Sequence, residues 1–291
     1  MFIIYQLICR YPYHLHFARA ITDYQGNELK ENDVKERLQA LKVRIKDDHD
    51  INNEMRQDDD YLLRYLHFSD FNIQQAHLQF KKFYKLLTND AKWFGYATPK
   101  AHQDQLQKNM RLLLDTRDRD GRLILIAKMG NINPSQSSLN DVLKLDDIMM
   151  ELGWDDPITL RKGFCGILDV KDMGFRLMQW ATPKNLIFAV KKLEAMPVKD
   201  LKIHCVNKSR YLSTMMTITW PFLPAKFKEN IYFHEDKWES LHKYIDPASL
   251  PTEYGGTNTK SYDEYIKDVL DKDNQLVETT KYIKFFVKDA K

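Results

Sequence analysis

The stretch from residue 163 to residue 170, Gly-Phe-Cys-Gly-Ile-Leu-Asp-Val, constrains the fold of this chain more than any other. It has the length of a β-strand and is almost entirely apolar, with one carboxylate, Asp169, near its end. A strand without polar alternation is typical of a parallel sheet that is covered on both faces. We therefore expect the strand to be buried on both faces, in a sheet that lies between layers of helices.

The segments around this strand alternate between helix and strand patterns. Ser138 and Asp141 have the spacing of a capping box before an apolar helix, and Thr182 followed by Pro183 marks the start of another helix. Short apolar runs predict further strands at residues 111–115, 122–129, 201–206 and 231–233. The turn Asp-Arg-Asp-Gly joins the first two of these runs into a hairpin. The alternation indicates an α/β fold.

A helical unit precedes the sheet, over residues 30–95. Apolar residues spaced as on one helical face predict its first helix: Val34, Leu38, Leu41 and Ile45. The acidic run 58–60 marks the start of a second helix, and Asn72 caps a third, which carries an aromatic stripe. Helical spacing of this kind is typical of packing against neighbouring helices, so we assign the stripe to the core.

Composition narrows the class of protein. There are 44 lysines and arginines against 41 acids, so the net charge of +3 gives no general attraction to nucleic acid, and none is expected as a partner. Cys9, Cys165 and Cys205 are too far apart for a zinc motif or a disulfide framework. The chain has no apolar run of roughly 20 residues that would span a bilayer. We expect a cytoplasmic protein that contacts membranes only transiently.

Motifs for catalysis are missing from the sequence, so no enzyme activity, catalytic residue, metal or cofactor is expected. The glycine patterns of nucleotide-binding loops and of the hydrolase elbow do not occur. His234 and Glu235 begin a zinc-protease pattern, but its second histidine would fall at Trp238, so we interpret them as surface residues near a strand end. Asp169 could serve catalysis at a sheet edge, but capping of a turn or a helix is the preferred role.

Several motifs follow one another along the chain in the order of a known protein family. Residues 59–66 read Asp-Asp-Tyr-Leu-Leu-Arg-Tyr-Leu, as in that family's helical module. Residues 166–170 are similar to its central strand, Asn207 matches the asparagine of its NxP motif, and 221–224 resemble its KPFL segment. The match of residues 250–256, Leu-Pro-Thr-Glu-Tyr-Gly-Gly, to LPxEYGG is the most specific. With these motifs the chain resembles the CRAL-TRIO family of intracellular lipid-transfer proteins, including its tocopherol- and retinoid-carrying branch.

The resemblance implies a fold and a division of the chain. The implied α/β fold is an N-terminal helical unit followed by a lipid-binding domain, in which a β-sheet flanked by helices is the floor of a hydrophobic cavity. We expect an irregular leader (1–29), the helical module (30–95), the CRAL-TRIO domain (96–258) and a C-terminal tail (259–291). Asn207 is expected to cap a helix over about residues 209–220, within the segment that matches the family's mobile gate.

The resemblance also implies a site for one small hydrophobic lipid. We expect its lining from the strand, the helix after Thr182 and the gate: Phe164, Leu168, Leu186, Ile187, Val190, Leu193, Leu212, Met215, Met216, Ile218 and Phe222. Where the phosphatidylinositol-carrying branch has an acid and a lysine, this chain has Val198 and Trp220, which favours a tocopherol, retinoid or carotenoid. A permanently buried helix is the alternative to a gate.

A basic patch near the gate is the implied contact with an anionic membrane surface that carries phosphoinositides. The matching lysines are Lys199, Lys202, Lys226 and Lys228. Leu201 and Asn230 stand where the tocopherol branch is basic, so solvated surface lysines are the competing interpretation.

Three functions follow, in order of preference. The first is binding and transfer of a single small hydrophobic ligand, with release at membranes through the gate. The second is a lipid-sensing module that binds a protein partner, or a phosphoinositide or phospholipid transfer protein. The third, an enzyme that acts on a lipid, lacks any assembled nucleophile, metal or cofactor motif.

Overall fold

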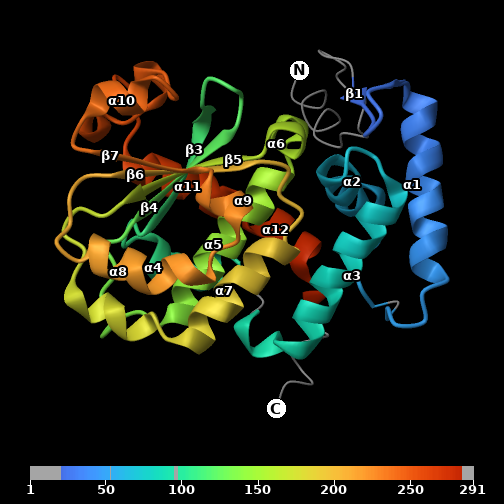
Figure 1. Cartoon of the computed structure of the whole chain (residues 1–291), viewed down its shortest axis with the longest axis horizontal. Helices are drawn as coiled ribbons and strands as arrows, with labels where there is room; N and C mark the ends of the chain where they lie inside the picture. The colour runs from blue at the N-terminus through green and yellow to red at the C-terminus, as the bar shows by residue number, and fades with distance from the viewer. Residues whose placement is uncertain (1–20, 53, 95–97, 284–291) are drawn as a thin grey trace, which may run out of the picture.

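The computed structural model describes residues 21–52, 54–94 and 98–283 and consists of a helical unit beside an α/β domain (Figure 1). Its helices are α1 (Glu31–Lys46), α2 (Asp59–Phe68), α3 (Ile73–Asn89), α4 (Gln103–Leu106), α5 (Leu139–Trp154), α6 (Pro157–Lys162), α7 (Pro183–Ala195), α8 (Leu212–Thr219), α9 (Ala225–Lys228), α10 (Trp238–His242), α11 (Tyr262–Asp271) and α12 (Asp273–Thr280). Its strands are β1 (Ile21–Thr22), β2 (Glu28–Leu29), β3 (Arg111–Arg117), β4 (Leu123–Lys128), β5 (Phe164–Asp169), β6 (Leu201–Val206) and β7 (Ile231–Glu235).

The predicted strands form one five-stranded sheet in the order β3-β4-β5-β6-β7, which confirms the α/β class. β3 and β4 are the expected antiparallel hairpin, and β4 to β7 are parallel. The apolar run that predicted a central strand is β5, in the middle of the sheet. Figure 1 shows α7 and α8 on the opposite side of the sheet from α10.

The helix starts that the sequence marks are formed locally. The side chain of Ser138 accepts a hydrogen bond from the backbone N–H of Asp141, while the Asp141 carboxylate accepts one from the backbone N–H of Ser138. Asp58, Asn72 and Thr182 each accept a bond from the backbone N–H three residues further on. These caps satisfy N–H groups that the first turn of a helix leaves without partners.

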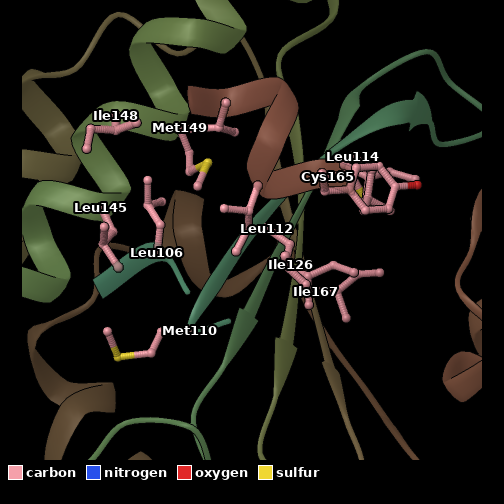
Figure 2. Packing of buried hydrophobic residues seen from close by; sticks show 14 of the residues in the cluster. Leu106, Met110, Leu112, Leu114, Ile126, Leu145, Ile148, Met149, Cys165 and Ile167 are labelled. Carbon is pink, nitrogen blue, oxygen red and sulfur yellow. The ribbon is translucent and has the colours of Figure 1, made fainter. Parts of the chain in front are cut away.

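The two faces of the sheet are buried to different extents. One face carries Ile126 and Ile167, which have no exposure, because residues of the segment after β7, including Leu241 and Ile245, pack in the same cluster. Figure 2 shows part of this cluster, where α5 meets β3. On the other face Gly166 and the side chain of Leu168 are only half-buried, so the expectation that β5 is covered on both faces is wrong for that side.

The ends of the chain add structure that the sequence did not specify. Residues 1–20 of the expected leader lie outside the described residues, while residues 21–29 form the small hairpin β1-β2 instead of an irregular segment. In the expected tail, α11 buries Tyr265 and Ile266 and α12 buries Leu276, so this segment is part of the core.

The helical unit is held to the α/β domain by buried charges. The guanidinium of Arg64 in α2 lies 2.8 Å from the Glu151 carboxylate in α5, and it sits over the rings of Tyr61 and Trp154. Because a buried cation is stable only when it is paired, this contact fixes how α2 lies against α5.

Asp169 is a hub at the carboxyl edge of the sheet. Its carboxylate accepts hydrogen bonds from the backbone N–H of Lys171 at 2.9 Å, from the side-chain amide of Asn207 at 2.6 Å and from the hydroxyl of Tyr254 at 2.9 Å. The expected role of Asp169 in a turn is confirmed, but the expected helix cap at Asn207 is wrong. The side chain of Asn207 binds Asp169, its φ is 67°, and α8 starts only at Leu212, after a residue without a side-chain cap.

We expect Tyr254→Phe to lower the free energy of unfolding by about 1–3 kcal/mol, since it removes one donor from a buried carboxylate without changing the shape of the core. Burial, followed by the charge of Asp169, raises the pKa of Tyr254 far above its usual value, so its hydroxyl keeps the proton that it donates. Urea unfolding measures the change. Tyr24→Phe, at an exposed ring, is the control, and equal stability of the two variants would contradict the role of the hub.

Candidate functional site

The half-buried side of the sheet is the best candidate site, and we call it the open face. Paired residues on neighbouring strands point to the same side, so the strand register defines this face. Its two rows are Leu125, Gly166, Ile203 and Ile231, and Ala127, Leu168, Cys205 and Phe233. All of these residues are apolar apart from the thiol, and most remain partly accessible. The result is a broad apolar floor in the middle of an otherwise well-packed domain.

The amino end of this face is closed by protein. Phe164 precedes Gly166 on the same side, and its side chain is 1% exposed and packs edge to face on Trp154 of α5. A β-carbon added at Gly153 would lie only 2.4 Å from the Phe164 ring. Phe164 is therefore a core residue beneath α5, and we do not include it in the proposed lining. Leu168, two pleats further on, remains in it.

Helix α8, the expected gate, contains no buried residue, unlike the other apolar helices of the domain. Leu212 and Met215 pack on the edge of the main core, Met216 is half-buried, and Ile218 is 37% exposed. A helix of this composition normally buries most of its side chains. This arrangement does not fit the alternative of a permanently buried helix.

The predicted residues of α7 divide into two groups. Leu186 and Val190 are half-buried, and Ile187 is 45% exposed, on the side of the sheet where α8 also lies (Figure 1). Leu193 lies at the other end of the helix and lines a separate groove, which is described below. Phe222, at the end of the expected gate, is half-buried after Pro221.

Two exposed aromatic rings near this face were not predicted from the sequence. Phe175 is 66% exposed and Phe233 is 49% exposed, which is unusual for phenylalanine. Phe233 is in the outer row of the open face, and the ring of Phe175 contacts Tyr211 just before α8. The alternation of β7 offered a weak signal for Phe233, but the six-residue turn around Phe175 has no apolar periodicity that would have marked it.

The four predicted lysines do not form one patch. Lys199 and Lys226 line a groove of about 260 Å³ together with Leu193 and Asn230. Lys202 instead lies above the Tyr232 ring, 5.8 Å from its centroid, and Lys228 lies above Trp220. The groove thus joins half of the predicted set.

The histidine considered for a zinc site is not a surface residue, which corrects that interpretation. His234 is buried, and its Nε2 lies 2.8 Å from Nδ1 of His204, while its Nδ1 lies 2.7 Å from the hydroxyl of Ser240. Burial lowers the pKa of His234, and burial together with His234 lowers the pKa of His204 to about 3. Within residues 21–52, 54–94 and 98–283, no three His, Cys, Asp or Glu side chains are grouped to hold a metal.

Together, the helical unit and the five-stranded sheet define an α/β protein, and the open face is an apolar, partly accessible side of that sheet. A sequence model of the CRAL/TRIO domain matches residues 107–256, about half of the chain. The chain belongs to the CRAL/TRIO family of lipid-binding and lipid-transfer proteins.

Similar proteins agree with this assignment. Clavesin-1 of Xenopus laevis is 30% identical over 206 residues, 70% of this chain and 62% of the relative. Clavesin-2 of Homo sapiens is 29% identical over 205 residues, 69% of this chain and 63% of the relative. The crystal structure of Sfh5 has the same fold, with a TM-score of 0.55 and 12% identity over 87% of this chain and all of that one. The chain thus spans less than two thirds of the clavesins' length.

We expect truncation of an isoleucine to have opposite consequences on the two faces of the sheet. Ile167→Ala, at a side chain with no exposure, should cost about 2–5 kcal/mol of unfolding free energy, because it leaves a cavity. Ile203→Ala, on the open face, should cost less than half as much, because its site is already partly accessible. Chemical unfolding of both variants tests this, and equal losses would show that the open face is ordinary core.

Proposed function

We propose that this protein binds one small hydrophobic lipid against the open face and carries it between membranes through the cytoplasm. The observation that best supports this proposal is the apolar, half-accessible open face of the sheet. Helix α8, which contains no buried residue, lies on the same side of the sheet. Apolar area removed from water gives about 25 cal/mol per Å². A ligand that buries about 300 Å² there would gain about 7 kcal/mol.

The composition of the floor supports a compact apolar ligand such as a tocopherol, a retinoid or a carotenoid. Its two rows contain no charged or amide side chain, so a large polar headgroup would find no partner on the sheet itself. A phospholipid is the second candidate. The groove beside Lys199 and Lys226 favours it, since two lysines there could meet an anionic headgroup.

Release at a membrane is the proposed role of α8. The helix has few buried contacts to lose, and its methionines suit contact with an irregular ligand. Pro221 lies two residues after the end of α8 and limits how far the helix can continue. Exposed apolar side chains on the same part of the protein, Phe175, Ile187 and Ile218, would enter the interfacial layer of a bilayer while the helix opens. None of the described helices is long and apolar enough to cross a membrane.

We propose a carrier and not an enzyme. Asp169 is the carboxylate at the edge where α/β enzymes place catalytic groups, yet its oxygens are engaged by Asn207 and Tyr254. A base needs a free lone pair directed at a substrate, and these bonds use the carboxylate for structure instead.

The proposal is tested by extraction of lipid from the purified protein and mass spectrometry of the extract. We expect one apolar lipid in a ratio near one to one, and vesicle-to-vesicle transfer of that lipid. Phe222→Ala should lower the occupancy several-fold with little change in the thermal midpoint, because this ring is half-buried at the end of the gate. Phe188→Ala, at a ring packed on the helical unit, is the control and should lower stability instead. Protein that carries no lipid and transfers none would exclude a carrier, while occupancy without transfer would favour a lipid sensor.

A second prediction concerns the groove at Lys199 and Lys226. We expect the Lys199→Ala, Lys226→Ala double variant to bind phosphoinositide vesicles about tenfold more weakly at low salt, with the difference shrinking as salt screens the charges. Vesicle co-sedimentation measures it. Lys243→Ala with Lys267→Ala removes the same charge from exposed positions elsewhere and serves as the control. Equal binding by the two double variants would show that the groove does not contribute to membrane binding.

A further inference from the structure

A second groove lies between the helical unit and the α/β domain and shares one lining residue, Lys199, with the groove at Lys226. Its volume is about 570 Å³, and it is bounded by α6, the β3-β4 turn and the α2-α3 turn. Its charged lining is Arg119, Arg161, Lys162 and Lys199 against Asp70 and Asp120. Four cations and two carboxylates leave a local charge of +2 in a chain whose total is only +3. The groove therefore has a local excess of positive charge.

Two of these cations have no hydrogen-bond or ion-pair partner among the residues that the structure describes. Arg161 and Lys162, at the end of α6, are half-buried, and neither makes a hydrogen bond or an ion pair with any described residue. Arg122, just before β4, shows the usual arrangement, since it binds Asp118, Asp120 and Asp200. Half-buried cations without a counter-charge lose hydration and gain nothing in return, which favours an anion that enters the groove.

A buried histidine completes the groove. The His67 side chain is 8% exposed, lines the groove and contacts the Phe71 ring, and no described residue accepts or donates a hydrogen bond to its imidazole. Burial first, and then the charges of Arg161 and Lys199, lower the pKa of His67 to about 3. The ring is therefore neutral at physiological pH and offers one N–H donor toward the groove.

We propose that this groove is a phosphate-binding site, in which Arg161 and Lys162 bind the oxygens of a phosphate group and the imidazole of His67 donates a further hydrogen bond. A guanidinium matches two phosphate oxygens at once, and an ammonium adds a point charge. The site is distinct from the open face and from the groove at Lys226, and it does not depend on the proposed lipid cargo.

The test is titration calorimetry of the full-length protein with inorganic phosphate and with pyrophosphate in low-salt buffer. We expect binding that Arg161→Gln with Lys162→Gln weakens about tenfold or more, with Arg161→Lys intermediate. Lys243→Gln with Lys267→Gln, which removes the same charge at exposed sites, should bind like the parent. Phosphate should also shift the His67 imidazole resonances and raise the pKa of that ring, which a purely structural histidine would not show.

A second arm of the experiment distinguishes a soluble phosphate compound from a lipid headgroup. It compares binding to phosphatidylcholine vesicles that either contain or lack phosphatidylinositol bisphosphate. Binding of free phosphate that depends on Arg161 and Lys162 supports a soluble phosphate compound. Dependence on these residues only with the phosphoinositide vesicles supports a lipid headgroup. If neither probe distinguishes this double variant from its charge-matched control while both remain folded by circular dichroism, the site does not exist. Failure here leaves the lipid extraction result unaffected.

Discussion

The carboxylate of Asp169 joins three segments that are far apart in the sequence. It accepts hydrogen bonds from Lys171 after β5, from Asn207 after β6 and from Tyr254 in the segment after β7. Each bond satisfies a polar group at a buried edge, and together they fix where the chain leaves the sheet. Close packing supports the same anchor: a β-carbon at Gly256 would lie 1.9 Å from the carbonyl oxygen of Leu250. The most specific sequence motif of this chain, residues 250–256, therefore has a structural role: it holds the segment after β7 to the carboxyl edge of the sheet.

Local signals in the sequence were sufficient for most of the fold. Ser138 and Thr182 form their caps with residues three positions away, so their roles can be inferred without tertiary structure. Asn207 was misassigned because its partner, Asp169, is 38 residues earlier. An asparagine side chain, which often caps a helix, can also donate a hydrogen bond to a carboxylate at the end of a neighbouring strand. His234 was misassigned for the same reason, since its partner His204 is 30 residues away on the next strand. Short helices such as α6 carry too few residues to show a period.

The candidate site was harder to predict than the fold, because apolarity does not say which side of a strand faces a ligand. Phe164 and Leu168 have the same character in the sequence and point to the same side, yet α5 covers only Phe164. Lys199 precedes β6 and lines a groove, whereas Lys202 lies within β6 above the Tyr232 ring, and sequence spacing does not separate the two. The groove at Arg161 and Lys162 was missed because its cations come from three segments that are far apart in the sequence.

The residues just after α12 join the end of the α/β domain to the first helices of the chain. The hydroxyl of Tyr282 lies 3.2 Å from that of Tyr61, and Tyr282 and Ile283 pack in the core of the helical unit, although 221 residues separate the two tyrosines. A chain that leaves the ribosome from its N-terminus can form α1 to α3 early. The core between these helices lacks the contacts of Tyr282 and Ile283 until residue 283 has also left the ribosome. Until then, the apolar side chains that Tyr282 and Ile283 contact in the folded protein lack these partners.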